Sequence, residues 1–202
     1  CGSLSLMGKW EYREPFLPLL HGVQFVEFGD AEAVEDELYK ADATGKGVAA
    51  VIMEPIQGEA GAIVPPDDFW PRIRKACDEY GALLIADEVQ TGMGRTGRMF
   101  GLEHWNTVPD ILCLGKALGG GMPMGAFVSS QQRMHLLTHD PVLGHITTFG
   151  GHPVPCVAGH AALEVLLDDG LVENARRMGE LFKQRLVHPA IREVRGKGLM
   201  LA

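Results

Sequence analysis

The sequence predicts an α/β fold with a mostly parallel sheet that has helices on both faces. Short apolar runs alternate along the chain with amphipathic stretches of helical periodicity. Polar side chains follow three of these apolar runs directly. Strands that alternate with helices form right-handed βαβ units, which build parallel sheets. Ligands of such sheets bind beyond the carboxyl ends of the strands, so the polar side chains at those ends are the first candidates for function.

The first part of the chain is expected to contain two strands and two helices. Residues 23–28 and 48–53 predict strands, and the second is almost continuously apolar, as a strand buried on both faces requires. Residues 31–41 predict an acidic helix. A second helix is predicted to open at two prolines and to run over 65–80, ending at Gly81.

The remaining elements continue the alternation. Strands are predicted at 82–86, 110–114 and 125–129, and helices at 154–167 and 171–186. Both helices carry apolar residues at a spacing of three to four. We expect the second helix to bury Leu171, Ala175, Met178 and Phe182.

We divide the chain into a large domain at 1–188 and the beginning of a smaller α/β domain at 189–202. The boundary follows His188-Pro189, after which 191–194 and 199–202 are predicted to pair as short strands. The chain begins at Cys1 without an initiator Met or a signal peptide, and it stops inside the second unit. We therefore expect it to be cut from a longer protein.

Composition excludes several classes of protein. Of the 202 residues, 46% are apolar and 22% are charged, as in ordinary globular domains, and the net charge of −8 argues against a nucleic-acid partner. No apolar run approaches the roughly 18 residues of a membrane span. Cys1, Cys77, Cys113 and Cys156 are widely spaced and form no CxxC pair, which predicts free thiols in a reducing, cytoplasmic compartment.

Asp87 and Lys116 are the strongest candidates for chemistry. Asp87 ends a buried strand, where a carboxylate needs a cation or a donor. It either caps the following loop or faces a ring nitrogen that must stay protonated, as in a pyridine cofactor. Lys116 lies between apolar residues and three glycines. Either it is an exposed loop lysine, or it is a buried amine activated as a nucleophile toward carbonyls.

Two further segments are polar and glycine-rich. Thr147 and Thr148 precede a helix, where they either bind a phosphate or cap the helix. Glu54 and Glu59 follow the apolar run at 48–53, and they either meet an ionic substrate or form an ordinary loop. No His lies at ligand spacing, so no metal site is predicted.

These segments together resemble the class III aminotransferases, which depend on pyridoxal 5′-phosphate and adopt fold type I. The resemblance covers nearly the whole chain. Its motifs are EPIQGE at 54–59, LIADEVQTGMGRTG at 84–97, PDI at 109–111, GKALGGG at 115–121 and TFGGHP at 148–153.

The resemblance implies a role for each matching residue. Lys116 forms a Schiff base with the cofactor and shuttles the proton, and Asp87 pairs with the pyridinium nitrogen. Val89 packs on one face of the ring, and Gln90 reaches the ring hydroxyl.

Other implied roles concern the phosphate and the substrate. Thr148, with Thr147, binds the phosphate of the other subunit's cofactor, which implies a homodimer. Glu54 stands behind the residues that touch the cofactor. Glu59 resembles the glutamate that, in ornithine-type members, pairs with an arginine and gates the substrate carboxylate.

The implied activity is transfer of an amino group from an amino acid or ω-amino donor to a 2-oxo acid such as 2-oxoglutarate. The motifs are most similar to acetylornithine and ornithine aminotransferases. The alternatives are an aminomutase, racemase or decarboxylase of the same family, or a truncated chain without catalysis. The family's phosphate loop, ring-stacking aromatic and carboxylate-binding arginine have no match in this sequence.

Overall fold

The central sheet has four strands and is mostly parallel, as predicted. The computed structural model describes residues 2–140, 142 and 144–202. The strands lie in the order β1 (Ala50–Met53), β2 (Leu83–Asp87), β3 (Ile111–Leu114) and β4 (Ala126–Ser129). The first three are parallel, whereas β4 runs antiparallel to β3. The connection from β3 to β4 is shorter than the dozen or so residues that a parallel crossover needs, which explains the reversal.

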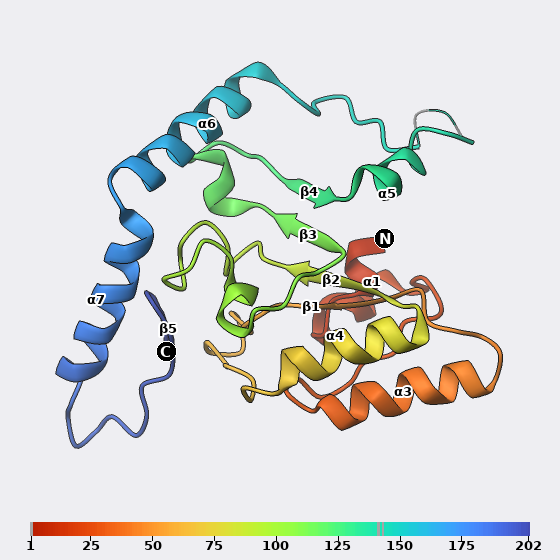
Figure 1. The fold of residues 1–202 in the computed structure, drawn as a ribbon, viewed down its shortest axis with the longest axis horizontal. Helices are drawn as coiled ribbons and strands as arrows, with labels where there is room; N and C mark the ends of the chain where they lie inside the picture. The colour runs from red at the N-terminus through yellow and green to blue at the C-terminus, as the bar shows by residue number, and fades with distance from the viewer. Residues whose placement is uncertain (1, 141, 143) are drawn as a thin grey trace.

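Two helices cover one side of the sheet, and two others follow one another along the left of the molecule in Figure 1, beyond the carboxyl ends of β2 and β3. The first pair is α3 (Ala31–Ala43) with α4 (Phe69–Tyr80), and the second is α6 (Pro153–Asp168) with α7 (Leu171–Arg185). The other elements are short: α1 (Gly2–Ser5), α2 (Trp10–Arg13), η1 (Glu14–Phe16), η2 (Gly101–Trp105), η3 (Lys116–Gly119), α5 (Gln131–His135), β5 (Gly196–Lys197) and β6 (Met200–Leu201).

The core lies between α3, α4 and the sheet. Trp70 and Trp105 are buried there, with their ring centroids 6.5 Å apart, as expected for core aromatics. The Asp30 carboxylate caps α3 by accepting from the Ala33 N–H at 3.0 Å. Gly81 adopts φ +69° and ends α4, as predicted.

Two predicted strands are not present. Residues 23–28 make no ladder pairing, so the prediction there is wrong, although Val26 and Phe28 pack against the core. The prediction for 191–194 is also wrong, because the C-terminal hairpin pairs β5 with β6 further along the chain. Gly196 (φ +119°) and Gly198 (φ +55°) adopt positive φ angles, which glycine tolerates and other residues disfavour. These conformations place the turn at Gly198 and Leu199.

The apolar faces of α6 and α7 are less buried than their periodicity predicts. Leu171 and Phe182, expected in the core, are 39% and 50% exposed, whereas Ala175 is buried. Small residues make the closest approaches: a Cβ on Gly159 would lie 2.6 Å from the Leu118 carbonyl oxygen. The helices therefore contact the body through glycine and alanine and leave larger apolar side chains in solvent.

Three thiols fall in the described part of the chain. Cys77 is buried, Cys113 and Cys156 are half-buried, and all three are free; Cys1 lies outside the described residues. Among 2–140, 142 and 144–202, no helix is long and apolar enough to cross a membrane. The boundary between 1–188 and 189–202 stays a prediction.

Candidate active site

The carboxyl edge of the sheet gathers three of the predicted site residues. Glu54 follows β1 directly, Asp87 ends β2, and Lys116 begins η3 just after β3. The strands are in register there, with Met53 opposite Ala86 and Asp87 opposite Cys113. The charges of both Asp87 and Lys116 act on the pKa of Glu54, which places all three groups in one neighbourhood.

Lys116 opens onto a pocket of about 330 Å³. Val89 and Gln90 line the same pocket. Its other walls come from the loop at 57–63, from Arg95 and from residues 199–202 of the C-terminal hairpin. The pocket therefore combines an amine, a carboxamide and an apolar wall, all at the end of the sheet where ligands of α/β folds bind.

The Lys116 side chain is exposed, so of the two alternatives the structure shows the exposed lysine and not the buried amine. In the described part of the chain, no hydrogen bond or ion pair reaches its amine. The backbone of Lys116 adopts φ +45°, a conformation that costs about 1 kcal/mol or more in a residue with a side chain. Strain of this kind concentrates at functional sites. The geometry presents a free amine to the pocket instead of packing it away.

The glycines after Lys116 allow this turn to pack closely against α6. Gly120 has φ +57°, and a Cβ there would lie 2.6 Å from the Ala158 carbonyl oxygen on α6. Any side chain at this position would push α6 away. The glycine-rich run thus serves close packing beneath Lys116.

Asp87 and Glu54 are half-buried, and each accepts one backbone hydrogen bond. Asp87 Oδ1 accepts from the Val89 N–H at 3.1 Å, and Glu54 Oε2 accepts from the Gly58 N–H at 2.9 Å. Burial raises the pKa of Glu54, and the charge of Asp87 raises it further, whereas the Gly58 bond and the charge of Lys116 lower it. The net shift is upward.

Glu59 lies on the loop at 57–63 but points into solvent. Its side chain is 75% exposed and approaches Lys9 Nζ at 3.9 Å, a contact of little energetic weight. Gly58, its neighbour, packs against the carboxamide of Gln90, where a Cβ would lie 2.6 Å from Oε1. The loop therefore touches the pocket while Glu59 itself stays outside.

Thr147 and Thr148 do not join the pocket within this chain. Both are exposed and lie ahead of α6. The alternative that they cap the helix is wrong, because His152 Nδ1 accepts from the Val154 N–H at 3.3 Å instead. Their hydroxyl groups remain available to a partner.

Glu88 was not singled out from the sequence, yet it is 1% exposed. Its carboxylate accepts from the Gly101 N–H at 2.8 Å, from the Leu102 N–H at 3.0 Å and from the Thr91 hydroxyl. Burial raises its pKa, and these three donors oppose the rise. The sequence signal that could have identified Glu88 as buried is its position directly after Asp87, at the end of a strongly apolar stretch.

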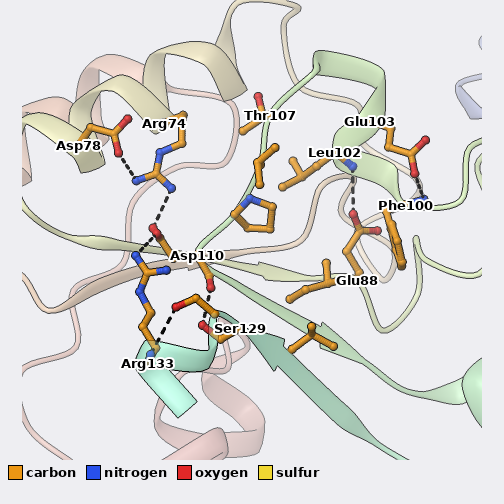
Figure 2. A pocket seen from close by; sticks show the side chains of 15 residues that line it. Arg74, Asp78, Glu88, Phe100, Leu102, Glu103, Thr107, Asp110, Ser129 and Arg133 are labelled. Carbon is orange, nitrogen blue, oxygen red and sulfur yellow. Dashed lines mark hydrogen bonds and ion pairs between the residues drawn. The ribbon is translucent and has the colours of Figure 1, made fainter. Parts of the chain in front are cut away.

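A second cleft of about 680 Å³ lies at the opposite, amino end of β3. Figure 2 shows Asp110 between two guanidinium groups, with Oδ2 at 2.8 Å from Arg74 and Oδ1 at 2.6 Å from Arg133. Asp110 also accepts from the Leu84 N–H at 2.8 Å. Every charge around Asp110 has a partner, which marks this cleft as structural.

Neither region provides a metal site. In the ranges that the structure describes, no group of three His, Cys, Asp or Glu side chains converges.

Comparison with known proteins gives a consistent result. The profile of the family Aminotransferase class-III matches residues 1–202. An ornithine aminotransferase from Toxoplasma gondii is 36% identical with a TM-score of 0.88, over 97% of this chain and 46% of its own. An acetylornithine aminotransferase from Elizabethkingia anophelis is 40% identical with a TM-score of 0.78, over 86% of this chain and 43% of its own.

An (S)-enantioselective omega-transaminase from Thermomicrobium roseum is equally similar. It is 36% identical with a TM-score of 0.87, over 99% of this chain and 49% of its own. The chain thus spans about half the length of the solved structures it matches.

Proposed function

Because the chain belongs to the class III aminotransferase family, we propose that the protein transfers an amino group from an amino acid or ω-amino donor to a 2-oxo acid such as 2-oxoglutarate. The observation that carries the proposal is the free Lys116 amine in a pocket with Val89 and Gln90, just after the strand β3 that pairs with the Asp87 end of β2. An unpaired amine at that edge is suited to covalent chemistry with a carbonyl.

The residues present fit the family's cofactor, pyridoxal 5′-phosphate. Gly58 lets the loop at 57–63 pack closely on the Gln90 carboxamide, because a Cβ there would lie 2.6 Å from Oε1, and this holds Gln90 in the wall of the pocket. The donor set is also appropriate, because the pocket offers the Lys116 amine and the Gln90 carboxamide, and the Asp87 carboxylate ends the strand next to β3. When bound, the cofactor supplies an aldehyde that captures amines and a ring that accepts electrons.

Each of these residues would then have a distinct role. Lys116 would hold the cofactor through its amine and move the proton at the α-carbon of the amino donor. The Asp87 carboxylate would keep the ring nitrogen protonated, which would preserve the ring as an electron acceptor. Val89 would pack against the ring, and Gln90 would donate a hydrogen bond to its hydroxyl group. Glu54, in the neighbourhood of both charged groups, supports Asp87 and Lys116.

We propose a homodimer in which Thr148 and Thr147 bind the phosphate of the partner's cofactor. Both hydroxyl groups are exposed and lie ahead of α6, away from the pocket of their own chain. Exposed apolar side chains follow and precede them in the sequence, with Ile146 73%, Phe149 79% and, on α6, Val157 69% exposed. Apolar groups of this size in solvent favour burial against a second copy.

For the donor, we propose an amino acid of the ornithine or acetylornithine type. Glu59 supports this choice because it is exposed on a loop that touches the pocket and is held only by the 3.9 Å contact with Lys9, which leaves it able to pair with an arginine and gate the substrate carboxylate. The three free cysteines favour the cytoplasm as the compartment.

The test uses the natural full-length protein and a panel of donors with 2-oxoglutarate. L-ornithine, N-acetyl-L-ornithine and 1-phenylethylamine are supplied in turn, and glutamate is measured. We expect glutamate with one of the first two donors, together with near-ultraviolet and blue absorbance of the bound cofactor. Absorbance without glutamate, accompanied by racemised, rearranged or decarboxylated donor, would instead identify another reaction of the family. A colourless protein without turnover would refute the proposal.

A further inference from the structure

Arg195 connects the C-terminal hairpin to the loop at 57–63. It lies directly before β5, and its Nε donates to the Gly61 carbonyl oxygen at 2.7 Å. The two residues are 134 positions apart in the sequence. The same guanidinium donates through Nη1 to Glu193 Oε2 at 2.8 Å, which fixes its orientation.

The loop that receives this bond is compact and strained. Gln57 and Ile63 exchange two backbone hydrogen bonds of 3.1 and 3.0 Å, which close its base. At its tip Gly61 has φ +102° and Ala62 has φ +49°. Glycine is favoured at 61 because of this positive φ, and a Cβ there would also lie 2.8 Å from Arg195 Nη2, so the guanidinium would have to shift. The guanidinium therefore holds a turn that local preferences alone disfavour.

Both structures joined by Arg195 are walls of the pocket that contains Lys116. Gly58, Gly61 and Ala62 form one wall, and residues 199–202 form another. The hairpin is fixed at two more points: Arg195 and Ala202 exchange backbone hydrogen bonds of 2.9 and 3.0 Å, and the Leu199 N–H donates to the Arg95 carbonyl at 3.0 Å. Arg195 thus stands at the joint between the two walls.

The geometry points to Arg195 as a positioning residue of the active site, which sets how tightly the pocket holds the amino donor by fixing the loop at 57–63. This inference rests on the proposed function. Arg195 does not line the pocket, and it acts through Gly61 and the loop that carries Glu59. The amine of Lys116 and the carboxylate of Asp87 make no contact with it in the described residues, so the chemical step itself does not depend on Arg195.

The experiment compares R195A, R195K and the control R192A in the natural full-length protein. Arg192 is exposed and three positions away, so it controls for loss of charge in this segment. With L-ornithine or N-acetyl-L-ornithine, whichever the wild type prefers, we expect R195A to raise KM about tenfold, because a hydrogen bond from a charged donor is lost. We expect kcat to change less than about threefold, and R192A to match the wild type.

R195K separates positioning from general destabilisation. Its amine can still donate one bond to the Gly61 carbonyl, so we expect KM to rise only about threefold. This variant also serves if R195A does not fold. Hydrogen exchange at 57–63 is expected to be faster in R195A, with unchanged cofactor absorbance. An unaltered KM in both variants, or a loss confined to kcat, would overturn the inference. Absence of turnover in the wild type would instead refute the proposed function, and exchange at 57–63 would still test the link between Arg195 and the loop.

Discussion

The ionisable side chains at the two ends of β3 differ in their partners: those at one end form ion pairs and hydrogen bonds, and the one at the other end has none in the part of the chain that the structure describes. At the amino end, Asp110 accepts from Arg74, Arg133 and the Leu84 N–H, and its side chain is 15% exposed. At the carboxyl end, Lys116 makes no hydrogen bond or ion pair within the described residues and is exposed. The same strand therefore connects a cluster of ion pairs to an amine that has no such partner in the described residues.

This difference separates residues that hold the fold from residues that are kept for a ligand. A charge surrounded by partners contributes to stability when its solvation loss is matched by hydrogen bonds. A charge without partners contributes little to stability, and the strained backbone of Lys116 (φ +45°) costs free energy. We therefore expect substitutions at the carboxyl end to change activity and those at the amino end to change stability.

The substitution Lys116→Ala is the strongest test of this difference between the two ends of β3. We expect turnover to fall about 10⁴-fold or more, because both the covalent attachment and the proton transfer are lost. The absorbance of the attached cofactor is expected to vanish, as measured by spectroscopy of the purified protein. The free energy of unfolding is expected to change by less than about 0.5 kcal/mol, since the side chain is exposed.

The matched control is Lys46→Ala, another exposed lysine outside the pocket. It is expected to leave both turnover and absorbance unchanged. Full turnover in K116A would remove Lys116 from the mechanism.

The next largest effect is expected for Asp87→Ala. The variant leaves the ring nitrogen without its anion, so we expect kcat to fall by about three orders of magnitude, while the cofactor still binds through Lys116. Rapid-mixing measurement of the chemical step checks this. Asp67→Ala removes an exposed acid of the same type and should be neutral. A normal rate in D87A would contradict the role of Asp87 at the ring nitrogen.

Local pattern was sufficient to predict most of the fold. Residues 48–53 and 82–86 are nearly continuous apolar runs, and both form parallel strands. Gly81 ends α4 as its position after the helical stretch predicts. The failures at 23–28 and 191–194 have a common cause, because a strand also needs a neighbour with free backbone groups. Such pairing depends on tertiary structure, which periodicity does not reveal.

The site residues that directly follow strands could be predicted from the sequence. Contacts between segments that are far apart in the sequence could not. Glu54, Asp87 and Lys116 each follow an apolar run, so the topology of a parallel sheet brings them together. Arg195 reaches Gly61 from a hairpin 134 residues later, and no local signal indicates that contact. The sequence also left open whether Lys116 is exposed or buried, because apolar neighbours in sequence need not cover a side chain in space.

Glu88 tests whether the two ends of the sheet are independent, because it lines the Asp110 cleft and directly follows Asp87. In Glu88→Gln, the Thr91 hydroxyl and the Gly101 and Leu102 N–H groups are left with a single carbonyl acceptor. We expect a loss of about 2 kcal/mol in the free energy of unfolding, measured by denaturant titration. We expect kcat to fall less than about threefold, because the Asp87 bond to the Val89 N–H is untouched.

The control for this variant is Glu103→Gln. Glu103 is exposed, and among the described residues its carboxylate accepts a hydrogen bond from the Phe100 N–H alone, at 2.9 Å, so a loss below about 1 kcal/mol is expected. A large drop in kcat for E88Q at unchanged stability would mean that the two ends are coupled.

Asp110→Asn is expected to have the smallest effect, and the effect should depend on pH. Burial raises the pKa of Asp110, but the Leu84 N–H and the Arg74 and Arg133 guanidinium groups outweigh burial, so the pKa lies below its ordinary value. A lowered carboxyl pKa contributes stability above the unfolded pKa of about 4, and this contribution is lost as the pH falls through the folded value. We expect D110N to lose about 1–2 kcal/mol at pH 7, less than a fully buried pair because water reaches Arg133, and to approach the wild type at low pH. Unfolding titrations at several pH values measure this, with Asp78→Asn, the exposed partner of Arg74, as the control. A deficit that persists unchanged at low pH would show that the Asp110 charge is not what stabilises this end of the sheet.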